Sequence, residues 1–154
     1  MLKRLKRKPA TDPPASTTRL GDWYGNLLYV HKKQLALFVS EKSLLPVLIP
    51  ARELSELTAA LTSALTILLG AMGARRGAVE TEVARMHELS FGPTSSRSVL
   101  GSMNDMKRAI DFHLGRNPEM RLNDLAIDLG ETPYGALKYQ YPREVAVELL
   151  EGCE

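Results

Sequence analysis

The residues best suited to chemistry gather in one stretch, FGPTSSRSVLGSMNDM, which spans residues 91–106. A serine at a helix start accepts a hydrogen bond from a free backbone N–H, and the N–H groups left unpaired attract anions. A guanidinium group beside them is a fork that suits phosphate or carboxylate. The sequence therefore predicts an anion-binding site with these ligand-binding residues: Thr94, Ser95, Ser96, Arg97, Ser98, Asn104, Asp105 and Arg108.

The helix that should follow this start has one side with an unusual composition. At helical spacing, that side carries Arg97, Gly101, Asn104 or Asp105, and Arg108. Because Gly101 has no side chain, it leaves a notch in which a ligand or a neighbouring backbone fits. The alternative is structural: the serines only stabilise the helix start, Gly101 permits close packing, and Asp105 pairs with Arg108.

A catalytic centre is less well supported by the same residues. No histidine is near the stretch in sequence, and Asp105 would need a pKa raised by burial to act as a base. The histidines, at positions 31, 87 and 113, are far apart, and the chain has no cysteine pair, so we expect no metal site. No nucleophile elbow, phosphate loop or dinucleotide-binding fingerprint is present, and we expect no cofactor.

The compartment follows from cysteine usage and from the apolar runs. The one cysteine, Cys153, cannot form an intramolecular disulfide, which favours a reducing environment. No apolar h-region follows the basic N-terminus, and no apolar run reaches the roughly 18 residues that a membrane-spanning helix needs. The sequence predicts a cytoplasmic protein with no membrane association.

Charge is unevenly distributed along the chain. The overall net charge is +2, and residues 1–8 contain five cations and no acid, so the other residues carry −3. We predict a basic, Pro-containing flexible tail over residues 1–19 and a single α+β domain over residues 20–154. The tail offers an alternative site for nucleic acid, formed by Lys3, Arg4, Lys6, Arg7 and Lys8.

The apolar runs after residue 19 predict a small sheet. NLLYV, QLALFV and LLPVLIP are short, and polar turns separate them, which indicates three strands in an antiparallel meander. Proline donates no N–H, so the third strand, which contains Pro46, should be an edge strand or carry a bulge. Its nearly continuous apolar run indicates that helices cover the sheet. We expect an α+β fold in which three or four helices pack against an antiparallel β-meander.

Helical periodicity follows the predicted sheet. Leucines from Leu54 to Leu68 recur at core spacing, with a dimer seam as the alternative. A second helix should bury Val79 and expose Glu80 and Glu82. Residues 122–129 alternate in hydrophobicity, which favours a strand. The alternative there is a helix-turn-helix whose second helix would begin near Thr132.

The motif SRSVLGSMND is preceded by GDWYGNLLYV and LALFVSEKSLLPVLIP and followed by a late ETP. This arrangement, from Thr18 to about Pro142, resembles an uncharacterised family of small bacterial α+β domains with an SRSxLGSMND-type signature. The family has no settled activity, so the resemblance implies a bacterial source and a single α+β unit.

The predicted function is a non-catalytic bacterial binding or regulatory module, monomeric or dimeric, that recognises an anionic ligand or a protein partner. One alternative is a small phosphodiester hydrolase or nuclease in which Arg97 holds phosphate and Asp105 is the base. The other is a nucleic-acid-binding protein that uses the basic tail. A cleft with a second titratable group near Arg97 would favour the enzyme.

Overall fold

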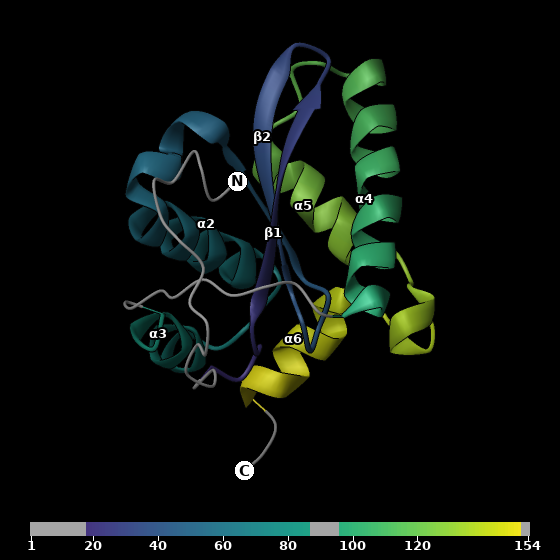
Figure 1. Ribbon diagram of the computed structural model, residues 1–154. Helices are drawn as coiled ribbons and strands as arrows, with labels where there is room; N and C mark the ends of the chain where they lie inside the picture. The colour runs from purple at the N-terminus through teal and green to yellow at the C-terminus, as the bar shows by residue number, and fades with distance from the viewer. Residues whose placement is uncertain (1–17, 87–95, 152–154) are drawn as a thin grey trace.

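The computed structural model describes residues 18–86 and 96–151 (Figure 1). Its strands are β1 (Trp23–Val30), β2 (Lys33–Ser40) and β3 (Pro46–Pro50), which form an antiparallel meander in that order. Its helical elements are η1 (Ala51–Glu56), α2 (Leu57–Ala71), α3 (Arg76–Ala84), α4 (Arg97–Arg116), α5 (Leu122–Gly130), η2 (Gly135–Leu137) and α6 (Pro142–Glu151). The predicted α+β fold is confirmed, with five α-helices in the described residues where three or four were expected.

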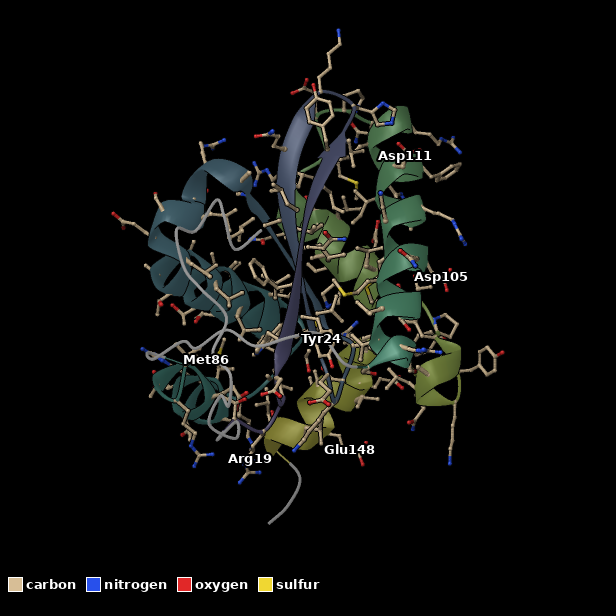
Figure 2. The ribbon with its side chains drawn as sticks, viewed as in Figure 1. Arg19, Tyr24, Met86, Asp105, Asp111 and Glu148 are labelled. Atoms are coloured by element: carbon tan, nitrogen blue, oxygen red, sulfur yellow. The ribbon has the colours of Figure 1, made fainter. Side chains whose placement is uncertain are left out.

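A two-residue turn joins β1 to β2. His31 and Lys32 both have positive φ, 47° and 67°, which is the type I′ geometry that matches the twist of a hairpin. The tip also contacts the C-terminal half of α4, because His31 Nε2 lies 3.1 Å from Asp111 Oδ1 (Figure 2). Lys33 Nζ donates to the carbonyl of Pro118 just beyond that helix. These contacts hold two non-glycine residues in a conformation that favours glycine.

The third strand lies at the edge of the sheet, as its proline predicted. Pro46 is the first residue of β3, and β3 is an edge strand that pairs only with β2 in the described sheet. The prediction for Pro46 is confirmed: on the outer side of β3 the described sheet has no further strand that would need an N–H donor from this residue.

Helices cover the sheet from both sides, so its strands are buried. Figure 1 shows α2 on one side of the sheet and α4 with α5 on the other; β3 contacts both α2 and α5, and β1 contacts α4. Every residue from 35 to 40 and from 46 to 49 is buried. This explains why the apolar runs of the second and third strands are nearly continuous.

The leucine stripe of α2 belongs to the core. Leu61, Leu65 and Leu68 are at most 2% exposed, whereas Ile67 on the outer face is 56% exposed. With η1, this helix is long and apolar enough to span a membrane, as core helices of soluble proteins also are. The buried leucines assign the stripe to the interior of this domain, and the dimer-seam alternative for it is wrong.

Residues 122–129 form α5, so the strand predicted there is wrong. Leu125, Ala126, Leu129 and Gly130 are buried at the spacing of one helix face, and α5 packs on β3. The apolar residues of this short segment fit both the alternation of a strand and the spacing of a helix face. Packing against the sheet stabilises the helix. The helix-turn-helix alternative is also not supported, because no helix begins near Thr132: η2 follows at Gly135 and α6 at Pro142.

Glu82 departs from the amphipathic pattern of α3. Val79 is buried as predicted, but Glu82, which was expected to face solvent, is only 1% exposed. Its Oε1 accepts from the backbone N–H of Arg19 at 2.8 Å, and its Oε2 accepts from that of Leu20 at 3.1 Å. Figure 2 shows Arg19 at the corner where α3 meets α6. The carboxylate is buried because two backbone donors from the start of the domain need an acceptor there.

Candidate functional site

The start of α4 is capped as the sequence predicted. Ser96 is the N-cap residue, and its Oγ accepts from the backbone N–H of Val99 at 3.2 Å. The backbone N–H of Ser96 donates to the hydroxyl of Tyr24 on β1 at 3.0 Å (Figure 2). The first bond caps the helix, and the second holds its start against the sheet. Thr94 and Ser95 lie outside the described residues.

Arg97 and Ser98 occupy the first turn of α4, and both are exposed. The first turn contains no acidic residue, and no acidic side chain in residues 18–86 and 96–151 pairs with Arg97. Within the same ranges, nothing accepts from the backbone N–H groups of Arg97 and Ser98. The guanidinium and two helix N–H donors thus face solvent at one end of the helix.

The face of α4 beyond Arg97 is open. Gly101 and Asn104 are exposed, and a Cβ added at Gly101 would meet no atom within 4 Å. The suggestion that Gly101 permits close packing is therefore wrong. The notch lies on a solvent-facing surface, where the helix backbone is accessible.

Asp105 and Arg108 form a surface ion pair, as predicted by the interpretation in which this stretch only stabilises the helix. Arg108 Nη1 lies 3.1 Å from Asp105 Oδ1, and the two side chains are 80% and 61% exposed. Figure 2 shows Asp105 on the outer side of α4. An exposed pair at this spacing contributes only tenths of a kcal/mol. It also leaves Asp105 without the burial that a general base needs at this position.

Sequence reasoning missed Tyr134, which lies beside the site. η2 contacts α4, and Tyr134, just before η2, is 6% exposed and donates from its hydroxyl to the carbonyl of Leu129 at 3.3 Å. The pKa of Tyr134 is raised to about 12, chiefly by burial and also by the negative charge of Asp105, while the hydrogen bond with the side chain of Thr132 acts in the opposite direction. A separation of 29 positions from Asp105 leaves no local signal for this contact.

The raised pKa predicts that stability falls in alkali. Between pH 10 and pH 12 the unfolded chain loses the Tyr134 proton while the folded chain retains it, so folding stability decreases as pH rises. We expect a loss of roughly 2–3 kcal/mol over this window from this group. The check is denaturant unfolding at several pH values. Subtracting the unfolding free energies of the Tyr134→Phe variant removes the contributions of the other titrating groups. If the unfolding free energy depends on pH in the same way in the two proteins, the prediction is contradicted.

Two hollows in the described residues lie away from α4. Each has a volume of about 470 Å³. One is lined by residues of α6 and Met72, and the other by Arg19, Arg75 and residues of α3 and α6. Neither contains Arg97 or any other residue of the predicted anion site. Among the described residues, no cluster of three histidine, cysteine or acidic side chains is arranged to hold a metal.

Comparison with known proteins identifies a family. No curated protein and no solved structure matches the chain. A family model described as a domain of unknown function, DUF6933, matches residues 1–145, a range that includes the basic segment and the whole of α4. Since this match covers nearly the entire chain, the protein belongs to the DUF6933 family.

Proposed function

We propose that this protein is a non-catalytic bacterial binding module that recognises an anionic group, phosphate or carboxylate, carried by a partner protein. The observation that carries the proposal is the exposed Arg97 beside the backbone N–H groups of Arg97 and Ser98 at the start of α4; in residues 18–86 and 96–151 neither the guanidinium nor these two donors has a partner. A guanidinium fork and a helix N-terminus bind the same oxygens, so the two donors reinforce each other.

The shape of the surface supports a macromolecular ligand over a small molecule. Pockets that hold small ligands bury most of the ligand surface, and neither of the two hollows described above includes Arg97. The open face at Gly101 and Asn104 allows a segment of another protein to lie along α4 after its anionic group has reached Arg97. An extended partner gains area from this face that a free ion does not.

The same geometry disfavours the hydrolase. Asp105 is 61% exposed and paired with Arg108, and neither of the two hollows described above brings a second titratable group to Arg97. A hydrolase needs a positioned base within hydrogen-bond reach of its nucleophile. Tyr134, whose pKa is raised, stays protonated near neutral pH, and its hydroxyl donates to a backbone carbonyl.

The test is titration of the 15N-labelled protein with a phosphoserine peptide and, separately, with inorganic phosphate. We expect the amides of Arg97 and Ser98 to shift on binding, and Arg97→Ala to weaken peptide binding roughly tenfold, the loss of one charge-assisted contact. The matched control is Arg76→Ala. Arg76 holds the same first-turn position in α3, but Glu80 neutralises it at 3.0 Å, so its loss should leave binding unchanged.

Two results would count against the proposal. Peptide binding that survives Arg97→Ala refutes the site at α4. Binding that survives this substitution and disappears when residues 1–8 are deleted assigns recognition to the basic segment, which the family match also includes. The deletion should leave the amide shifts of Arg97 unchanged if the site at α4 acts alone.

A further inference from the structure

The two edges of the sheet are protected to very different degrees. β3 is five residues long and has a proline at each end, which hinders pairing with another strand. β1 is eight residues long, contains no proline and no charged residue, and pairs with β2 without a bulge from Trp23 to Val30. In the described sheet no strand pairs with its outer side. An uninterrupted, uncharged edge strand is a template for a further strand.

The hairpin turn determines which residues of β1 face outward. A β-turn bonds its first and fourth residues, so Val30 and Lys33 bond each other across the turn at His31 and Lys32. Because inward and outward bonding alternates along an antiparallel strand, the backbone groups of Gly25, Leu27 and Tyr29 point away from β2. Tyr29 is 69% exposed, so its side chain is also accessible.

The charges that flank β1 favour a second copy of the same strand as its pairing partner. Asp22 precedes the strand and Lys32 follows it, and both are exposed. When two copies of β1 pair antiparallel with Leu27 opposite Leu27, Asp22 of each copy lies opposite Lys32 of the other. The same register places Tyr29 opposite Gly25, and an aromatic side chain across from a strand glycine is a favourable pair. An uncharged strand with complementary ends is therefore matched to itself.

We propose that β1 pairs antiparallel with β1 of a second copy of this chain, which joins two three-stranded sheets into one of six strands. This interaction surface is independent of the proposed anion site on α4. A single pair of strands makes an interface at the weak end for specific dimers, so we expect a dissociation constant that is roughly micromolar.

The test is sedimentation equilibrium of the full-length chain over a range of concentrations. Tyr29→Lys should raise the dissociation constant roughly tenfold or more, because it places a charge on the edge and removes the aromatic pair. Ile67→Lys is the matched control, since it adds the same charge to an exposed apolar position on α2. It should leave the dissociation constant unchanged.

A charge exchange tests the register. Asp22→Lys should weaken the dimer because it faces Lys32, and the double variant Asp22→Lys with Lys32→Asp should restore it; aspartate tolerates the positive φ of position 32. Concentration-dependent protection of the amide hydrogens of Leu27 and Tyr29 would locate the contact. A monomer up to about 1 mM overturns the proposal. So does a dimer that Ile67→Lys dissociates and Tyr29→Lys does not, or one that the double variant fails to restore.

Discussion

Glu82→Ala is expected to lower the free energy of unfolding by roughly 2–4 kcal/mol, since it leaves two backbone donors at a buried position without an acceptor. Those donors are the N–H groups of Arg19 and Leu20, bonded at 2.8 and 3.1 Å, and Leu20 is fully buried. The carbonyl of Leu20 accepts from the buried hydroxyl of Ser40 at 2.6 Å, so the same residue ties α3 to the end of β2. Denaturant unfolding measures the loss.

Two further variants distinguish the loss of the buried hydrogen-bond acceptor from the effects of charge and of helix propensity. Glu80→Ala removes a carboxylate from the exposed side of the same helix, where it pairs with the exposed Arg76, and should cost less than about 0.5 kcal/mol. Glu82→Gln keeps one acceptor oxygen and should cost about half as much as Glu82→Ala. Equal effects of Glu80→Ala and Glu82→Ala would show that the two backbone bonds do not stabilise the fold.

Leu65→Ala is expected to destabilise the protein by about 2–5 kcal/mol, through the lost burial and the cavity that remains. Leu65 is fully buried on the face of α2 that belongs to the core. Ile67→Ala, two residues along the helix and 56% exposed, should change stability by less than about 0.5 kcal/mol. A larger effect of Ile67→Ala would mean that the outer face of α2 is covered in solution. Unfolding at several protein concentrations distinguishes that case.

The sequence by itself determined the features that depend on neighbouring residues. The three apolar runs and the polar turns between them specified the meander, and Pro46 specified an edge because a missing N–H is a local property. The serines before Arg97 specified a capped start for the helix that became α4. Each signal lies within a few residues of the structure it predicts.

Tertiary structure alone decided the features that depend on distant contacts. Residues 122–129 satisfy two periodicities, and burial against β3 selected the helix that became α5. Glu82 has the pattern of a solvent-facing residue, and only the docking of residues 19 and 20 makes its burial favourable. Asp105 raises the pKa of Tyr134, although the two residues are 29 positions apart in the sequence.

For the anion site, too, the sequence predicted some features and the tertiary structure decided the others. The sequence predicted a serine-capped helix start beside Arg97, because capping chemistry is local, and the structure shows that Ser96 is the cap. The sequence left two interpretations of Gly101 and Asp105, and the structure distinguished them: Gly101 faces open space, and Asp105 is paired with Arg108 at the surface. Which face of a helix remains uncovered depends on how the other elements pack around it, and a single sequence records that packing only through its buried residues.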